Sequence, residues 1–206
     1  ILLDVGAGTG EVTRRWPVRV IALDNAFGMC REAHKKPLPT LQAVAEALPV
    51  KSAAVDVVAS NLMLQWLAEP KCFFAESARV LKAGGILAVA TFTEGTLAEL
   101  AAAFAAVGEH HRINDFAAPA MLTEKIKSAG FEVLNLHGET ITEHYEDMLD
   151  LCLYLRDIGA NNKRCDRPRG LLTLRKLRAA AGHYAMTEAG LPASWVVQMI
   201  VARKTA

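Results

Sequence analysis

Asp4-Val5-Gly6-Ala7-Gly8-Thr9-Gly10 is the stretch of this 206-residue sequence that decides the fold. The glycines follow the apolar run Ile1–Val5 and precede a stretch of helical length, which places them where a strand turns into a helix. Glycine lets a backbone turn sharply and lets a ligand approach it closely. Three glycines in five residues exceed what a plain turn needs, so we expect a ligand at this point.

Short apolar runs alternate with stretches of helical length through the first 93 residues. The runs expected as strands are 1–5, 18–23, 41–44, 55–60 and 86–92. This alternation predicts βαβ units, with a parallel sheet and helices on both of its faces. Gly84-Gly85 is expected to end the helix before the last of these strands, and Thr96-x-x-Glu99 to cap the helix after it.

The second half predicts further helices and two more strands. Helices are expected at about 119–129, 145–158 and 173–186, and strands at 131–136 and 195–201. We therefore expect one domain over 1–206, an α/β fold with a doubly wound, mostly parallel, Rossmann-like sheet. Its cofactor-binding half is expected at 1–93 and its substrate-side half at 94–206, with a helical insertion at about 145–190 before the last strand.

Composition excludes several classes of protein. Apolar residues make up 52% of the chain and charged residues 22%, which excludes a disordered chain. No uncharged stretch approaches the ~20 residues of a spanning helix, and no signal peptide opens the sequence, so we expect no membrane partner. The four cysteines form no C-x-x-C pair, which indicates free thiols in a reducing cytoplasm and no metal site.

The net charge of +1 is unevenly distributed. Residues 1–155 carry 13 basic and 19 acidic side chains, a net −6, whereas residues 156–206 carry 10 basic and 3 acidic ones, a net +7. This split favours an anionic partner for the C-terminal part, although a solvated face balanced by the acidic part would give the same count. We predict no nucleic-acid partner.

The spacing of the glycines selects among possible ligands. A dinucleotide-binding turn reads G-x-G-x-x-G/A, but Glu11 stands at the last position here, and a carboxylate suits a pyrophosphate poorly. NAD is therefore disfavoured. The pattern D-x-G-x-G-x-G resembles motif I of class I S-adenosylmethionine-dependent methyltransferases. Asp24, at the end of the second strand, can accept hydrogen bonds from the ribose hydroxyls of either cofactor.

Residues 42–49 and 54–61 resemble the adenine-side loop and the fourth strand of the same fold. In relatives the loop often carries an Asp on the adenine amine; Val44 stands there in this sequence, so the resemblance implies that backbone groups around Ala45 and apolar packing hold the base. Glu46 keeps its place, although it would serve equally as a helix-start carboxylate. The residues expected to bind S-adenosylmethionine are Asp4, Gly6, Ala7, Gly8, Gly10, Asp24, Asn25, Ala45, Glu46 and Asn61.

Four segments resemble one family, the malonyl-[acyl-carrier protein] O-methyltransferases, which start pimeloyl assembly in biotin synthesis. They are SNLMLQWL at 60–67, RVLKAGG at 79–85, TFTEGTLAEL at 91–100 and RDIGANN at 156–162. The N-x-x-x-Q-W and I-G-A-N-N patterns are the most specific, because the bare fold requires neither. The resemblance covers essentially the whole chain.

The resemblance implies esterification of the free carboxylate of a malonyl thioester on an acyl carrier protein. Such a carboxylate is already ionised at neutral pH, so catalysis consists of alignment and electrostatics and needs no general base. We expect Arg112 to hold the carboxylate, Gln65 to lie at the methyl donor, and Trp66 and Asn114 to line the substrate site. The acidic carrier is expected to meet Asn161 and the basic side chains Lys163, Arg164, Arg167, Arg169, Arg175, Lys176 and Arg178.

Two departures from the family pattern leave alternatives open. Relatives carry a lid segment with a Tyr before the first strand; this sequence opens without Met on a residue typical of a strand interior, so we expect that segment to be missing. Asp115 stands where the family tends to have an Arg, so Arg112 or a basic residue of 163–169 must grip the carboxylate, or the substrate differs. The alternatives are a related methyltransferase-fold protein that acts on a protein side chain, as the arginine-hydroxylating assembly factors of respiratory complex I do, and a non-catalytic module that keeps the cofactor fold.

Overall fold

The computed structural model describes residues 1–110, 112–158, 160 and 172–205 of the chain. The chain packs as two compact units. The first unit comprises 1–92, 117–138 and 198–206, and the second comprises 93–116 and 139–197. The predicted boundary at residue 93 falls where the chain first passes between the units, and the division into a cofactor half and a substrate half stays a prediction.

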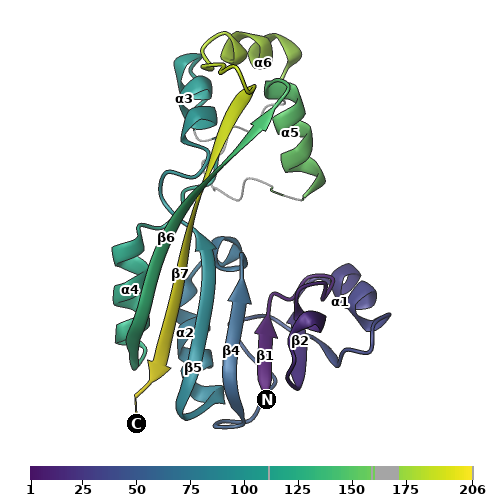
Figure 1. Ribbon diagram of the computed structural model, residues 1–206, viewed down its shortest axis with the longest axis vertical. Coiled ribbons are helices and arrows are strands. Elements are labelled where there is room, and N and C mark those ends of the chain that lie inside the picture. Colours follow the sequence, from purple (N-terminus) through teal and green to yellow (C-terminus); the bar gives the residue numbers. More distant parts are fainter. Residues whose placement is uncertain (111, 159, 161–171, 206) are drawn as a thin grey trace. The chain divides into compact units, whose positions relative to one another are not determined.

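A seven-stranded sheet runs in the order β3-β2-β1-β4-β5-β7-β6. Its strands are β1 (Leu2–Val5), β2 (Val20–Asp24), β3 (Thr40–Gln42), β4 (Val55–Asn61), β5 (Leu81–Phe92), β6 (Phe131–Tyr145) and β7 (Leu191–Lys204). The pairs β1–β2, β1–β4, β2–β3 and β4–β5 are parallel. Figure 1 shows that β7 is antiparallel to its neighbours β5 and β6. The mostly parallel α/β sheet predicted from the sequence is thus confirmed.

Helices cover the two faces of the sheet unequally within the first unit. The helices are α1 (Phe27–His34), α2 (Pro70–Val80) and α4 (Pro119–Ser128), with short 3-10 helices η1 (Thr13–Arg15) and η2 (Leu64–Trp66). α2 and α4 pack on the face that buries Leu3, Val58 and Leu87, and Figure 1 shows α2 behind the strands and α4 beside β6. The opposite face buries a smaller cluster around Leu2 and Ala59, and the described residues place no helix over it at β4, β5 and β7.

The helix expected directly after the glycine turn is only the three-residue η1. Pro17 explains its early end, because a proline disfavours the helical conformation in the residue before it, and Trp16 is extended with ψ of 130°. The first strand is therefore connected to η1 by a turn that contains Gly6, Gly8 and Gly10, all with positive φ.

Gly84-Gly85 does not end a helix, contrary to the sequence expectation. α2 ends at Val80, and Leu81–Phe92 is one strand that contains both glycines. The buried Leu81 pairs with Val55, and the register of β4 on β5 shifts between Val55 and Val57. A Cβ on Gly85 would lie 3.1 Å from the carbonyl oxygen of Asp56, so the glycine permits a close approach of two strands.

The second unit contains α3 (Ala98–Ala106), α5 (Met148–Asp157) and α6 (Leu174–Ala181). The predicted capping box at Thr96 and Glu99 is wrong: α3 begins after Leu97, and both side chains bind β7 instead. The Thr96 hydroxyl oxygen accepts the Val196 N–H at 3.1 Å, and Glu99 accepts a hydrogen bond from the Ser194 hydroxyl. Thr96 and Glu99 therefore form hydrogen bonds with β7 and do not cap α3.

Candidate functional site

The glycine turn at the end of β1 has a backbone that only glycine adopts readily. Gly6, Gly8 and Gly10 have φ of +79°, +58° and +71°, in the region that side chains disfavour. A Cβ on Gly6 would lie 2.4 Å from Cγ of Met63, whereas a Cβ on Gly8 would meet nothing within 4 Å. Gly6 is therefore required for packing, and Gly8 leaves open space where a ligand can approach the backbone.

Asp24 links the glycine turn to the end of β2. Its carboxylate accepts the N–H of Gly8 at 2.8 Å and the N–H of Ala26 at 2.9 Å, through different oxygens. Its carbonyl oxygen accepts the N–H of Ala43 at 3.0 Å, which brings in the loop after β3. Since the first three strands are parallel, their carboxyl ends meet at one edge, where ligands bind in open α/β sheets.

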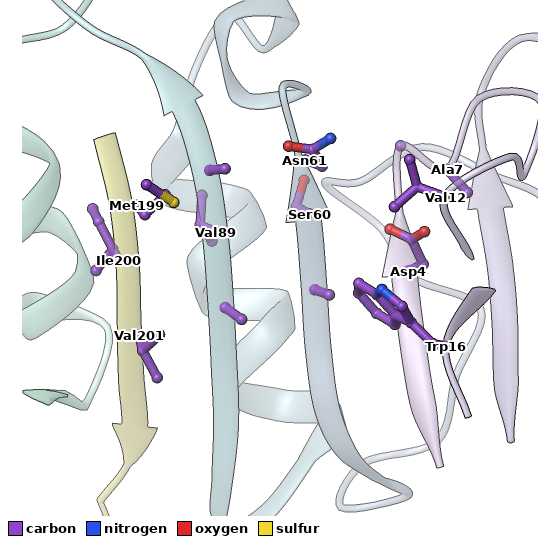
Figure 2. A pocket seen from close by; sticks show the side chains of 14 residues that line it. Asp4, Ala7, Val12, Trp16, Ser60, Asn61, Val89, Met199, Ile200 and Val201 are labelled. Carbon is purple, nitrogen blue, oxygen red and sulfur yellow. The ribbon is translucent and has the colours of Figure 1, made fainter. Parts of the chain in front are cut away.

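A pocket of about 450 Å³ opens beside the turn (Figure 2). It is lined by the predicted residues Asp4, Gly6, Ala7 and Asn61, together with Val12, Trp16, and residues of β4, β5 and β7. The Asp4 carboxylate is buried and accepts a hydrogen bond from the Thr13 hydroxyl. Burial raises the pKa of Asp4, the Thr13 bond opposes that rise, and the neighbouring Asp24 adds to it.

The loop after β3 buries the side chain of Ala45 and exposes the side chains on either side of it. Ala45 is buried in the main core, whereas Val44 and Glu46 are exposed. Asn25 is also exposed, and its carbonyl oxygen accepts the Gln42 side-chain amide at 3.3 Å. The side chain at the position of the family's Asp thus faces solvent.

β4 ends at Asn61, and the backbone turns there through Leu62, which has φ of +52°. The Gln65 side chain is held in η2: its amide donates to the Leu62 carbonyl oxygen at 2.6 Å, and its Oε1 accepts the buried Thr91 hydroxyl at 3.2 Å. Trp66 lies next to it and is half-buried. Gln65 is therefore fixed near the carboxyl ends of β4 and β5, and its place at the methyl donor stays a prediction.

Arg112 belongs to the second unit and binds a buried carboxylate there. Its Nε and Nη2 donate to Glu109 Oε2 at 2.8 and 2.5 Å, and the Lys176 ammonium of α6 donates to the other oxygen. The bonds from Lys176 and Arg112 hold the pKa of Glu109 below its usual range, so the carboxylate stays ionised at neutral pH. Arg112 is thus held by a salt-bridged anchor; Asn114, two residues on, is half-buried.

The predicted partner residues Asn161, Lys163, Arg164, Arg167 and Arg169 lie outside the described residues. Within the described residues, no group of three or more His, Cys, Asp or Glu side chains could hold a metal ion. None of the described helices is long and apolar enough to cross a membrane.

Sequence reasoning missed three residues that shape the turn: Thr13, Lys36 and Met63. Thr13 binds Asp4, Met63 packs against Gly6, and the Lys36 ammonium donates to the Thr9 carbonyl oxygen at 2.5 Å. Only the fold brings them to the glycines, so no local pattern could identify them. Glu11, which we expected beside the turn, is exposed and paired with Arg14.

These observations test whether the residues fit S-adenosylmethionine. The turn has open space at Gly8, a carboxylate from the end of β2 lies against it, and the pocket has the volume of a small-molecule site. The residues fit an adenosyl cofactor.

Comparisons with known proteins agree. Residues 3–89 match the family described as "Methyltransferase domain". The chain is 36% identical to malonyl-[acyl-carrier protein] O-methyltransferase of Xylella fastidiosa (strain M23), over 96% of this chain and 71% of that protein. It is likewise 36% identical to the protein of that name from Hahella chejuensis, over 97% of this chain and 75% of that protein.

The fold has a counterpart among solved structures as well. A protein of Bacillus halodurans described as a putative methyltransferase superposes with a TM-score of 0.73 at 18% identity, covering 100% of this chain and 92% of that one. By its sequence relatives, supported by the turn and the sheet, the chain belongs to the malonyl-[acyl-carrier protein] O-methyltransferase family.

Proposed function

We propose that this protein transfers a methyl group from S-adenosylmethionine to the free carboxylate of a malonyl thioester on an acyl carrier protein, a step of biotin synthesis. The observation that carries the proposal is the glycine turn with the Asp24 carboxylate bonded across it, in a chain of a family named for this reaction. A cytoplasmic location is part of the same proposal.

The cofactor would be held at the carboxyl ends of β1 to β4. The open backbone at Gly8 would accept close approach of the amino acid part, Asp24 would accept the ribose hydroxyls on its remaining lone pairs, and the loop around Ala45 would meet the base. When bound, S-adenosylmethionine supplies a methyl group on a positively charged sulfur. Asn61 and the fixed Gln65 would then border the reacting groups.

Arg112 would hold and orient the substrate carboxylate. A guanidinium binds a carboxylate through parallel hydrogen bonds, which directs one of its oxygens. Glu109 already binds Nε and Nη2 of Arg112, so this anchor fixes the plane of the guanidinium. No proton has to leave the substrate, because its carboxylate is ionised at neutral pH.

The carrier protein would dock on basic side chains of the C-terminal part. Arg175 and Arg178 are exposed on α6, whereas Lys176 is engaged by Glu109. An acidic carrier would be attracted and oriented by such a surface. The basic side chains of 163–169 belong to the same proposal.

The test is transfer of labelled methyl to malonyl-acyl carrier protein by the full native chain. Acetyl-acyl carrier protein, which lacks the free carboxylate, is the matched control. We expect label on the malonyl substrate alone, in a form that mild alkali releases as a methyl ester does. If the protein binds the cofactor but no label appears on the malonyl carrier, the proposed substrate is wrong. The assignment of the cofactor would still stand.

A further inference from the structure

Two side chains of α2 hold the loop that follows β3. Arg79 donates Nη1 to the Val50 carbonyl oxygen at 2.7 Å and Nη2 to the Leu48 carbonyl oxygen at 2.8 Å. Glu76 accepts the Leu48 N–H at 2.7 Å. Both backbone groups of Leu48 and the carbonyl of Val50 are therefore bound by one pair of side chains, 28 to 31 residues further along the chain.

The pair is also bound to itself. Arg79 Nε and Nη2 donate to the two oxygens of Glu76, each at 2.7 Å, in a parallel two-bond arrangement. The Glu76 and Arg79 side chains are 20% and 35% exposed, so the bonds are partly shielded from water. Hydrogen bonds that involve charged groups are stronger than neutral ones, so this arrangement, which we call the α2 clamp, holds the loop firmly at Leu48.

The clamp fixes one end of a loop whose other end lies in the cofactor site. At the near end, the Ala43 N–H donates to the carbonyl oxygen of Asp24, the residue that binds the glycine turn. Between Ala43 and Leu48, Ala45 is buried against the core. The backbone at Ala45 therefore lies between two fixed points, the bond of Ala43 to Asp24 and the bonds of Leu48 to the α2 clamp. Its position depends on both.

We propose that Glu76 and Arg79 are positioning residues for cofactor recognition: they hold the 43–50 loop so that its backbone groups meet the adenine edge and discriminate it from other purines. The inference rests on the proposed placement of the cofactor. A loop held in its binding conformation loses little freedom when the ligand arrives, whereas a loop that samples other conformations binds in proportion to the competent fraction.

The test measures binding rather than turnover, on the full native chain. Calorimetry gives the Kd of S-adenosylhomocysteine and of S-inosylhomocysteine, in which an oxo group replaces the adenine amine. The variants are Arg79→Met, which removes all the guanidinium bonds, and Arg79→Lys, which keeps the charge but not the parallel donors. The matched control is Glu32→Gln, which breaks the exposed Glu32–Lys35 pair of the same i,i+3 spacing on α1.

If Arg79→Met leaves the loop competent about a tenth of the time, its affinity for S-adenosylhomocysteine falls about tenfold. We expect the ratio of the two Kd values to fall toward one, with Arg79→Lys intermediate and Glu32→Gln unchanged. Hydrogen exchange should speed up within 43–50 and not across the sheet.

Two results would overturn the inference. The first is an Arg79→Met protein whose affinity and selectivity are unaltered. The second is an equal loss of affinity for both ligands together with faster hydrogen exchange throughout the first unit, which would indicate that the pair is merely structural. Failure of the unaltered protein to bind S-adenosylhomocysteine is a separate outcome. It would overturn the proposed cofactor itself, and with it this inference.

Discussion

Gly6 and Gly8 share a positive φ but serve the site in different ways. Alanine at Gly6 would bring a Cβ to 2.4 Å from Met63, so we expect backbone strain plus overpacking to cost roughly 2–4 kcal/mol of stability. Alanine at Gly8 meets no atom and should cost only about 1–2 kcal/mol, yet its methyl group would occupy the space that we propose for the cofactor. Urea unfolding and calorimetry with S-adenosylhomocysteine should show the larger stability loss for Gly6→Ala and at least a tenfold affinity loss for Gly8→Ala. Equal stability losses would contradict this assignment.

Arg112→Met should separate catalysis from cofactor binding. Loss of the guanidinium removes the proposed grip on the substrate carboxylate, so we expect kcat/KM for malonyl-acyl carrier protein to fall about a hundredfold or more. S-adenosylhomocysteine affinity should stay within twofold of the unaltered protein. Lys176→Met, which removes the other cation on Glu109, controls for the stability effect of weakening this anchor. Comparable losses of cofactor affinity in the two variants would contradict a substrate role for Arg112.

At the level of single residues, the sequence predicts what lies close along the chain. The three glycines and Asp24 could be identified because a turn and a strand end carry recognisable patterns. Thr13 and Lys36 could not, because their partners Asp4 and Thr9 depend on how η1 and α1 pack. The resemblance implies an arginine that holds the carboxylate, and Arg112 is one candidate because Asp115 stands at the family's Arg position. Its engagement with Glu109 depends on tertiary contacts that no spacing encodes.

Among the elements, α2 and the loop after β3 form a pair whose strength should depend on pH. The bonds from Arg79, and then from Leu48, hold the pKa of Glu76 below its ordinary value of 4.5. The unfolded chain therefore takes up a proton at this position at a higher pH than the folded protein. The contribution of Glu76 is fully present above about pH 4.5 and is lost as the pH falls through the lower folded value.

Glu76→Gln should accordingly destabilise the protein at pH 7, and the difference from the unaltered protein should shrink as the pH falls from 5 toward 3. Urea unfolding at several pH values measures it, with Glu124→Gln, at an exposed position of α4, as a surface control. A difference that does not change with pH would show that the ionised form of Glu76 contributes nothing.

Local helix signals were the least reliable part of the sequence. Thr96-x-x-Glu99 has the spacing of a capping box, but both side chains bind β7 instead. Thr96 accepts a hydrogen bond from Val196, and Glu99 accepts one from Ser194. Gly84-Gly85 has the composition of a helix stop, but the pairing of Leu81 with Val55 extends β5 to include it. In both cases a strand distant in sequence competes successfully for groups that local rules assign to a helix.

For the whole molecule, the distribution of charge predicts how salt affects turnover. The C-terminal 51 residues carry a net +7, and Arg175 and Arg178 are exposed there. Salt screens interactions between exposed charges over about 10 Å at 0.1 M. We expect the KM for malonyl-acyl carrier protein to rise several-fold between roughly 50 and 300 mM salt, with kcat little changed.

The control is the malonyl thioester of N-acetylcysteamine, which offers the same carboxylate without an acidic protein. Its KM should change much less over the same range. A parallel rise for both substrates would place the salt effect on the malonyl group and argue against docking through the basic surface.

The mostly parallel sheet was predictable because alternating strands and helices permit few topologies. The described residues of the second unit were harder, since their helices follow no such alternation. The extent of β6 and β7, which reach well past the apolar runs at 131–136 and 195–201, escaped prediction because polar residues such as Glu139 continue those strands.

The two hydrogen bonds that the Asp24 carboxylate accepts restrict which substitutions this position can tolerate during evolution. An asparagine there would keep one acceptor oxygen but turn an amide donor toward the N–H of Gly8 or Ala26, and so open the glycine turn. An inhibitor that engages the Asp24 carboxylate would therefore be hard to evade by substitution at this position. Resistance would have to arise at residues that the turn does not need, such as the exposed Val44 or Glu46.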